Sequence, residues 1–286
     1  MKYRFLRFPE GKTKAVTFSY DDGVHFDIPL AQIFDKYQVK GTFNINTHAM
    51  TSGSKRYLTA DQIKEHILDK GHEVAVHGAL HRAPGHQSAL DGIQDVLYCR
   101  RDLEQQFGMI IRGMAYPDSG IMRFSNGASY DNIKRYLTDL GIVYARSLSQ
   151  DNDEFMLPTD WHNWIPSAKH TNPLIFDYIK KFTELDVDRQ YIASRYPRLF
   201  YIWGHSFEFD QENNWDRMEL ICEQLAHKED TWYATNMDIY RYVSAYNSLE
   251  VSVDGSMIYN PTLLTIWFLV DDKTYCIQPG ETLNIT

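Results

Sequence analysis

The feature that most constrains the fold is a regular alternation of short apolar β-type runs with amphipathic segments of helical periodicity. The β-type runs, rich in β-branched and aromatic residues, fall at 15–20, 41–46, 73–77, 113–116, 142–145 and 199–203. The helical segments fall at 28–37, 60–70, 87–107, 130–140, 174–185, 215–227 and 237–245. Such alternation predicts parallel strands joined by helical crossovers, arranged as a barrel or a doubly wound sheet.

The pattern changes after residue 247. Two short apolar runs, 251–253 and 257–259, flank the turn dipeptide Asp254-Gly255, and a second pair at 263–270 and 274–277 flanks a polar turn. Each pair predicts a β-hairpin. We therefore expect a main domain at 1–246 and a small antiparallel β appendage at 247–286.

Composition excludes several classes of protein. The 286 residues carry a formal charge of −9 and no basic block, which argues against nucleic acid as a partner. The longest apolar stretch, 263–270, is far shorter than the roughly 18 to 20 residues that cross a bilayer, so no membrane partner is expected. The three cysteines fit neither a disulfide framework nor a thiolate zinc site. With no hydrophobic leader in the first residues, we expect a cytoplasmic protein, unless a leader precedes this sequence.

Carboxylates and imidazoles stand directly after several of the predicted strands. Ligands bind at the carboxyl ends of parallel strands, so these residues should gather at one mouth. Each motif alone is weak, because Asp-Gly pairs favour turns and single histidines are often structural. The residues concerned are Asp21, Asp22, His77, His81 and His205.

Charge and geometry indicate what this group can do. Two neighbouring carboxylates repel each other unless a cation lies between them. Two histidines and one aspartate form a ligand set that leaves positions open for water and substrate, which is typical of a catalytic metal site. A metal-bound water has its pKa lowered toward about 7. The remaining carboxylate, Asp21, can then accept a proton while a separate imidazole, His205, protonates a leaving group.

The segment Thr17-Phe18-Ser19-Tyr20-Asp21-Asp22-Gly23, the pair His77-x-x-x-His81 and the late His205 resemble the polysaccharide deacetylase family, the NodB-homology carbohydrate esterases. The resemblance covers roughly residues 13–240. It implies a distorted (β/α)7 barrel, with Asp21 as general base and His205 as general acid. It also implies that Asp22, His77 and His81 hold the metal.

The resemblance extends less securely to the walls of the site. The family has an arginine next to a Pro-Pro-Tyr-like segment, where it tethers the catalytic aspartate, whereas Arg112 here lies at the far end of that strand. Tryptophan side chains such as those of Trp161 and Trp164 belong to the core more often than they form platforms for sugar rings. The residues expected to contact substrate are Tyr116, Pro117, Asp160, Trp161, Trp164 and Trp203, with Arg112 in support.

These observations predict a hydrolase that removes an acetyl group from an acetylated sugar or oligosaccharide. The expected cofactor is a divalent metal, with Zn²⁺ favoured and Co²⁺, Ni²⁺ or Mn²⁺ compatible with the same ligands. Two alternatives stay open. A catalytically silent carbohydrate-binding relative is favoured by the displaced Arg112. A hydrolase of a small non-sugar amide, similar to allantoinases, is disfavoured by the intact set Asp22, His77 and His81.

Overall fold

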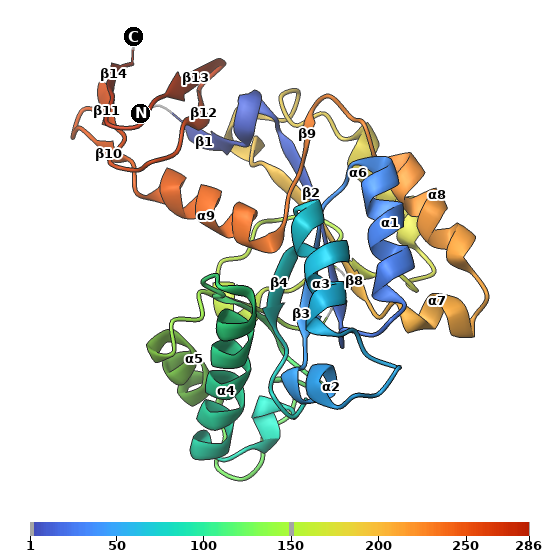
Figure 1. Ribbon diagram of the computed structural model, residues 1–286. Helices are drawn as coiled ribbons and strands as arrows, with labels where there is room; N and C mark the ends of the chain where they lie inside the picture. Colours follow the sequence, from blue (N-terminus) through green and yellow to red (C-terminus); the bar gives the residue numbers. More distant parts are fainter. Residues whose placement is uncertain (1–2, 149–151, 286) are drawn as a thin grey trace.

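The computed structural model describes residues 3–148 and 152–285 and is built around one parallel sheet (Figure 1). Its strands run in the order β6-β5-β4-β3-β2-β8-β7, and β9 also pairs with β2. The strands of this sheet are β2 (Lys14–Asp21), β3 (Gly41–Ile45), β4 (Glu73–Val76), β5 (Gly113–Ala115), β6 (Tyr144–Arg146), β7 (Ala168–Lys169), β8 (Arg198–Gly204) and β9 (Thr231–Tyr233).

Helices connect the strands and cover the outer face of the sheet (Figure 1). The α-helices are α1 (Asp27–Tyr37), α2 (Thr47–Thr51), α3 (Ala60–His66), α4 (Ala89–Phe107), α5 (Tyr130–Asp139), α6 (Ile175–Glu184), α7 (Phe207–Gln211), α8 (Trp215–Leu225) and α9 (Asn236–Asn247). Short 3₁₀ turns occur at η1 (Pro9–Gly11), η2 (Leu68–Lys70), η3 (Pro84–His86), η4 (Trp161–Asn163) and η5 (Ile192–Ser194).

Strand β2 shows how the sequence separates a core from a polar interior. All of its residues are buried, and successive side chains point to opposite faces. One face packs into the apolar core beneath the helices through Val16, Phe18 and Tyr20. The other face points into the barrel and carries Thr17, Ser19 and Asp21. The interior therefore receives polar groups that need partners, and the last of them is the predicted catalytic aspartate.

The sheet curls, and an irregular segment bridges its two outer strands. The backbone N–H of Trp164 donates to the carbonyl of Ala145, and the N–H of Ser147 donates to the carbonyl of Trp164. A few residues later, β7 pairs with β8. Residues 164–169 thus span the gap between β6 and β8, and the barrel closes without a full strand there.

The appendage consists of two small antiparallel sheets. One has the order β10 (Glu250–Val251), β11 (Met257–Tyr259) and β14 (Thr282–Asn284), and the other joins β12 (Ile266–Val270) to β13 (Lys273–Ile277). Strand β1 (Arg4–Arg7), from the other end of the chain, completes the second sheet by pairing with β12 (Figure 1). The division at 246/247 stays a prediction, and this strand crosses it.

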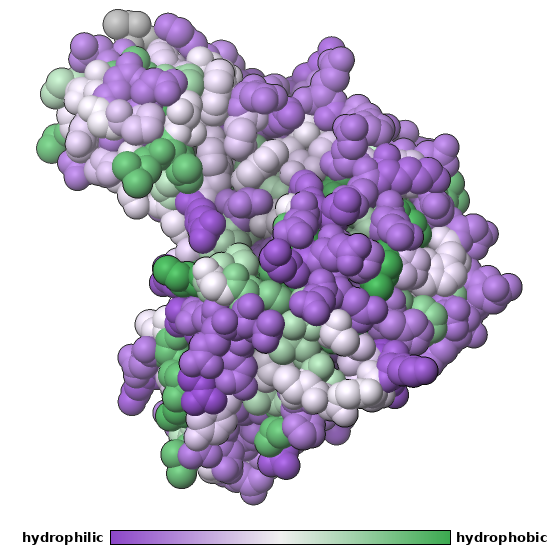
Figure 2. Space-filling view, in the orientation of Figure 1, coloured by the Kyte–Doolittle hydropathy of each residue, from purple (hydrophilic) through white to green (hydrophobic). Residues whose placement is uncertain are grey.

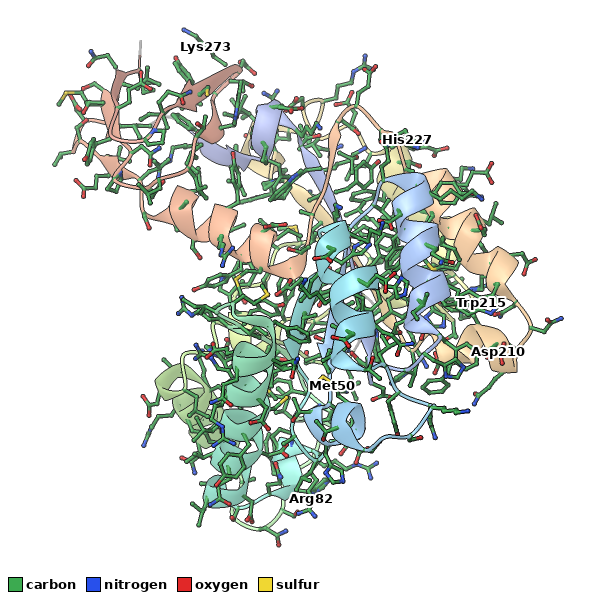
Figure 3. The ribbon with its side chains drawn as sticks, viewed as in Figure 1. Met50, Arg82, Asp210, Trp215, His227 and Lys273 are labelled. Atoms are coloured by element: carbon green, nitrogen blue, oxygen red, sulfur yellow. The ribbon has the colours of Figure 1, made fainter. Side chains whose placement is uncertain are left out.

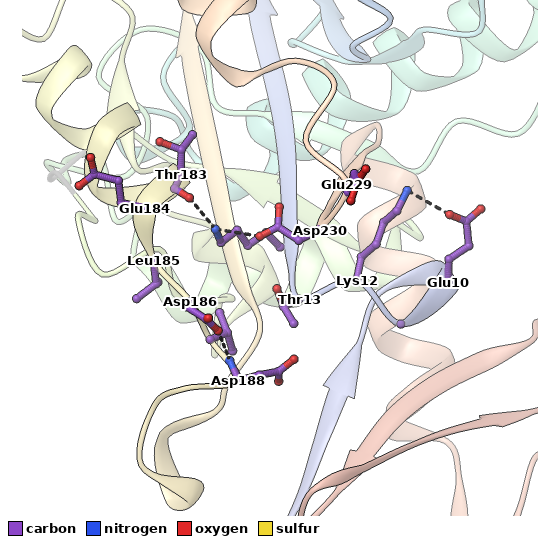
Figure 4. Close-up of a pocket in the computed structure, with 13 residues that line it drawn as sticks. Glu10, Lys12, Thr13, Thr183, Glu184, Leu185, Asp186, Asp188, Glu229 and Asp230 are labelled. Carbon is purple, nitrogen blue, oxygen red and sulfur yellow. Dashed lines mark hydrogen bonds and ion pairs between the residues drawn. The ribbon is translucent and has the colours of Figure 1, made fainter.

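The surface is largely polar on the face that Figure 2 shows, with scattered apolar side chains. Among the described residues, no helix has the length and apolar character needed to cross a membrane. At the amino end of β2, six of the thirteen residues that line a hollow of about 500 Å³ are acidic (Figure 4). In it the ammonium group of Lys14 contacts the carbonyl of Thr183 and the carboxylate of Asp230. None of the predicted site residues lines this hollow.

The structure confirms the predicted fold class, a distorted (β/α)7 barrel with an antiparallel appendage. Both predicted hairpins are present. The predicted helix at 60–70 begins at the Thr59 capping box but breaks into α3 and η2 before Gly71. Strands β1, β7 and β9 were not predicted, and each is only two to four residues long.

We predict that Arg7→Ala destabilises the protein by about 1 to 3 kcal/mol. The side chain of Arg7 is fully buried, donates to the carbonyl of Arg195 and pairs with Asp188 at 2.6 Å, so it ties β1 to the barrel. Chemical denaturation of the variant measures the loss. The control is Arg189→Ala, which removes an exposed arginine and should leave the free energy of unfolding unchanged within about 0.5 kcal/mol. Equal stability of the two variants would contradict the assignment.

Candidate metal and catalytic site

Asp22, His77 and His81 come together at the carboxyl end of the sheet. Asp22 follows β2, His77 follows β4, and His81 lies in the loop before α4. The Nε2 atoms of His81 and His77 lie 3.1 and 3.6 Å from Oδ1 of Asp22. Possible ligand atoms of the three residues all fall within 4.8 Å of one another. One ion could therefore contact all three side chains.

The loop from His77 to His81 is held by Asp95 of α4. The carboxylate of Asp95 accepts the backbone N–H of Leu80 at 2.7 Å. A Cβ atom at position 78 would lie 2.4 Å from the same carboxylate, and Gly78 has a φ of +73°. Only glycine meets both conditions without strain. This contact therefore holds the conformation of the loop that joins the two imidazoles.

The donor groups suit a divalent metal. Nδ1 of His77 lies 3.0 Å from the carbonyl oxygen of Ala115, so Nδ1 carries the hydrogen and Nε2 presents a lone pair toward Asp22. That Nε2 is buried and has no hydrogen-bond partner among the described residues. A histidine oriented by a carbonyl through its other nitrogen is the usual arrangement of a metal ligand. The residues therefore fit the cation that the sequence predicts.

The charges of the group are consistent with this fit. Burial lowers the pKa of His77 and outweighs the nearby carboxylates, which favours the neutral imidazole. Burial alone would raise the pKa of Asp22, but contact with His81 and the proximity of His77 lower it to about 2. The contact with Asp22 raises the pKa of His81 in return. At neutral pH the three side chains thus offer a carboxylate and at least one neutral imidazole.

Asp21 is held in place from two sides. Its Oδ1 accepts a hydrogen bond of 2.8 Å from the side chain of Asn44 on β3, and its Oδ2 accepts one from Arg146 on β6. Arg146 is fully buried and Asp21 is 2% exposed. The guanidinium of Arg146 also lies over the ring of Trp203, 4.4 Å from its centroid. The carboxylate therefore has a fixed orientation and a compensating charge.

His205 lies across from Asp21 and next to Glu208. Its Nε2 is 3.9 Å from Oδ2 of Asp21, and its Nδ1 is 3.4 Å from Oε1 of Glu208. Glu208 also pairs with Lys169 at 2.6 Å and lies 3.1 Å from Nε2 of the buried His170. Glu208 is thus the shared carboxylate of two imidazoles and one ammonium group.

This arrangement sets the protonation of His205. Burial lowers the pKa of His205, but the carboxylate of Glu208 and the charges of Asp21 and Asp22 outweigh burial and raise it. Burial raises the pKa of Glu208, yet His170, His205 and Lys169 together hold it well below its usual range. The imidazole of His205 is therefore biased toward the protonated form, which a proton donor requires.

Arg112 is not part of the site. Its side chain is exposed and donates to the carbonyl of Gly141, before the start of β5, so it lies at the amino end of the sheet. The buried partner of Asp21 is Arg146 instead. The prediction placed the supporting arginine on the wrong strand, because the resemblance drew attention to the segment around Tyr116.

The two tryptophans of the expected wall, Trp161 and Trp164, also lie elsewhere. Trp161 packs on Tyr240 of α9, and Trp164 is 1% exposed and packs on Tyr144 at the start of β6. Both contacts are at the amino end of the sheet, away from the mouth. Asp160 is engaged by two side chains of α5, Tyr130 and Lys134. The predictions for Trp161 and Trp164 were wrong, because both tryptophans pack the barrel, whereas the contact of Asp160 with substrate stays a prediction.

Tyr116 is directed away from the mouth as well. It belongs to the core beneath the helices, and its hydroxyl donates to the carbonyl of His162 at 2.7 Å. Trp203 does lie beside the site, 6.0 Å from the ring of His205 and under Arg146, but it is 7% exposed. The contact of Pro117 with substrate stays a prediction.

The sequence contained signals for the two residues that were missed. Arg146 stands immediately after the predicted strand at 142–145, where the other candidates were sought, and shares a strand face with Tyr144. Glu208 follows His205 by three residues, the spacing at which side chains meet on a helix. Arg146 was missed because the predicted strand ended one residue before it. Glu208 was missed because acidic residues are common in helices and carry no distinct signal.

Comparison with known protein families gives one match. Residues 9–145 match the sequence profile of a family described as polysaccharide deacetylase. Over these residues the chain is similar to the polysaccharide deacetylase family. The prediction of a hydrolase of the deacetylase class is confirmed at this level. The matched segment contains Asp21, Asp22, His77 and His81, whereas His205 lies beyond it. Among curated proteins, none matches the chain.

Solved structures resemble this chain over most of its length. A Mycobacterium smegmatis protein assigned to polysaccharide deacetylases aligns over 86% of this chain and 96% of its own, with a TM-score of 0.57 and 16% identity. The Puue allantoinase aligns over 82% and 91%, with a TM-score of 0.57 and 13% identity. The chitin deacetylase of Colletotrichum lindemuthianum aligns over 82% and 89%, with a TM-score of 0.50 and 18% identity. At these identities the likeness shows the fold.

A shorter alignment links the chain to a Streptococcus pyogenes deacetylase in complex with acetate. It covers 46% of this chain and 55% of that chain, with 20% identity and a TM-score of 0.41. The chain therefore spans about half the length of that protein.

We predict that His77→Ala weakens the binding of Zn²⁺ or Co²⁺ by more than about 100-fold, because it removes one of three ligands. Isothermal titration of the metal-free protein with either ion measures the affinity, with no reference to activity. His66→Ala, on α3 and outside the group, is the matched control and should bind the ion as the parent does. Equal affinities of the parent, His77→Ala and His66→Ala for the ion would contradict the proposed metal site.

Proposed function

We propose that this protein is a metal-dependent deacetylase that hydrolyses the acetyl amide or ester of a sugar or oligosaccharide. The observation that carries the proposal is the meeting of three metal-ligating side chains with a buried carboxylate and a protonatable imidazole. Asp22 and Asp21 are neighbours in the chain, and His205 faces Asp21. The match of residues 9–145 to the polysaccharide deacetylase family supports this reaction class.

The residues proposed to hold the cation are Asp22, His77 and His81. A divalent ion bound there supplies Lewis acidity to the acetyl carbonyl oxygen and lowers the barrier to attack by water. Nitrogen and carboxylate donors favour Zn²⁺ and also accept Co²⁺, Ni²⁺ or Mn²⁺. The chain's own contribution is to keep the imidazoles oriented, through Ala115 for His77 and Asp95 for the loop that carries His81.

Asp21 is proposed as the general base. Each oxygen of a carboxylate can accept two hydrogen bonds, so the bonds from Asn44 and Arg146 leave room for the proton of an attacking water. Both partners also restrict rotation of the carboxylate. A base that is already held in the geometry of proton transfer accelerates the reaction more than a mobile base does, and Asp21 is held in this way beside the three ligands.

His205 is proposed as the general acid that protonates the departing amine or alcohol. Its Nε2 lies near Oδ2 of Asp21, the oxygen that does not accept the hydrogen bond of Asn44. Its Nδ1 faces the carboxylate of Glu208. Glu208 keeps the imidazole charged and orients its ring. The same carboxylate is anchored by Lys169, so it stays ionised and fixed.

One observation favours a second candidate, hydrolysis of a small non-sugar amide. Trp161 and Trp164 pack at the amino end of the barrel, so the mouth lacks these two expected platforms for sugar rings. The Puue allantoinase has the same fold. Hydrolysis of allantoin by the metal-loaded protein, without acetate release from any acetylated sugar, would favour this candidate.

We predict that His205→Ala and Asp21→Asn lower acetate release from chito-oligosaccharides by about 100- to 10,000-fold while Zn²⁺ or Co²⁺ still binds. Each variant removes a proton-transfer group and leaves the three ligands in place. Asp21→Asn also leaves Arg146 buried without a counter-charge, so its thermal unfolding must be measured alongside. Full activity of either variant would contradict the role assigned to that residue. No release by the metal-loaded parent from any acetylated substrate would favour the binding-only alternative.

We predict that Glu208→Gln moves the alkaline limb of kcat/KM to lower pH. The acid must carry a proton, so activity falls as pH rises through the pKa of His205, which Glu208 raises. Removing that negative charge lowers the pKa and brings the decline to lower pH. Glu208→Asp keeps the charge and should recover part of the parent profile. An unchanged pH profile with reduced kcat in Glu208→Gln would limit Glu208 to a structural role.

A further inference from the structure

Asp27 is a buried carboxyl group near the site that the proposed mechanism leaves unused. It is the first residue of α1 and has no exposed surface. Its Oδ1 accepts a hydrogen bond of 2.6 Å from the hydroxyl of Ser206, the residue that follows His205. Its other oxygen, Oδ2, is buried and has no hydrogen-bond partner among the described residues. A buried polar group with one specific contact calls for an explanation.

The contact joins two segments that are far apart in the sequence. Helix α7, on which Asp210 is labelled in Figure 3, lies beside the first turn of α1. Ser206 occupies the N-cap position of α7, where a serine side chain usually caps its own helix. Here the side chain of Ser206 makes no such cap bond. Its hydroxyl holds the start of α1 instead.

Each side of the contact carries part of the catalytic group. Ser206 directly follows His205, in a turn that the N–H of Glu208 closes by donating to the carbonyl of His205. Asp27 ends the short loop that begins at Asp22. The bond between Ser206 and Asp27 therefore links the proposed proton donor to the loop that follows the proposed base and carries a metal ligand.

The charges near Asp27 favour its neutral form. The two other carboxylates at the end of β2 have partners, since Asp21 pairs with Arg146 and Asp22 contacts two histidines. Asp27 has no cationic partner among the described residues. Burial raises the pKa of Asp27 well above its usual range, the charges of Asp22 and Asp21 add to this, and the bond from Ser206 offsets only part of it. Asp27 thus accepts the hydroxyl without adding a third negative charge to the mouth.

We propose that Asp27 is a positioning residue for proton transfer, which through Ser206 fixes the imidazole of His205 relative to Asp21. The inference rests on the proposed deacetylase function, in which His205 donates the proton. Nε2 of His205 lies 3.9 Å from Oδ2 of Asp21. A displacement of about 1 Å at such a group can lower the rate about 100-fold. Asp27 acts through Ser206 and takes no part in the proton transfer itself.

Variants of the Zn²⁺-loaded protein test the proposal. Asp27→Ala and Ser206→Ala remove the contact, and each should lower kcat for acetate release about 10- to 100-fold while KM stays within about twofold of the parent value. Asp27→Asn keeps a neutral acceptor for the hydroxyl of Ser206. Its kcat should therefore stay within about twofold of that of the parent.

Ser167→Ala is the matched control, because it removes another buried serine hydroxyl. Ser167 is 1% exposed, and its hydroxyl donates to the carbonyl of Leu199 and accepts the N–H of Tyr201, near the amino end of β8. Ser167→Ala and Ser206→Ala should lower the midpoint of thermal unfolding by similar amounts. Only Ser206→Ala should lower kcat.

The pKa of His205 gives a second readout, which does not depend on turnover. Burial lowers this pKa, and the carboxylates of Glu208, Asp21 and Asp22 outweigh burial and raise it. A turn that is no longer held weakens these contacts, so the pKa of His205 should fall in both alanine variants of the contact. It should keep the parent value in the asparagine variant and in the control. NMR titration of the imidazole, assigned with His205→Ala, measures it.

Three results would overturn the proposal: loss of kcat in Asp27→Asn equal to that in Asp27→Ala, loss of kcat in Ser167→Ala equal to that in Ser206→Ala, or an unchanged His205 pKa in Ser206→Ala. If Asp27→Ala does not fold, Ser206→Ala carries the test, since it deletes a single hydroxyl. No acetate release by the Zn²⁺-loaded parent would count against the deacetylase function, and the pKa of His205 would then test the positioning role by itself. An active parent with equally active alanine variants would count against the positioning role alone.

Discussion

The ion pair between Asp21 and Arg146 is the interaction on which the site depends. Strands β3, β4 and β5 lie between the strands that carry the two residues, so the pair crosses the barrel interior. Such a contact forms only if the sheet curls. Both groups are almost completely buried, and removing one partner of a buried pair typically costs about 3 to 5 kcal/mol, because the other charge is left without compensation. The curvature of the sheet and the orientation of the carboxylate are thus specified together.

Much of the fold and of the candidate site could be predicted from the sequence, for a simple geometric reason. The carboxyl ends of parallel strands meet at one edge, so residues placed after strands, such as Asp22, His77 and His205, must converge once the alternation is recognised. The side-chain period of two then determines which of them enter the barrel. By the same period, the side chain of Tyr116 points to the outer face of the sheet, toward the helices. Its assignment to the site, which rested on the motif, was therefore wrong.

What could not be predicted depends on contacts between distant segments. Nothing local in the sequence links Arg146 with Asp21, which meet because the sheet curls, or Trp161 with Tyr240, which meet through the path of the chain after β6. Between Arg146 and Ala168, the residues that the structure describes form a short 3₁₀ turn and isolated backbone hydrogen bonds, which leave no periodic signal in the sequence. Motif order alone placed Trp161 and Trp164 at the mouth, and the path of this segment placed both tryptophans at the opposite end.

The pairing of β1 with β12 has a consequence for how the chain matures. About 260 residues separate the two partners in sequence, so this contact is among the most remote that the chain can make. During synthesis the amino-terminal strand emerges early and must wait, with an unsatisfied edge, until the final hairpin leaves the ribosome. The barrel strands can associate beforehand. Completion of this small sheet is therefore a late step, and a nascent chain stalled before residue 266 would present that edge to chaperones or to other chains.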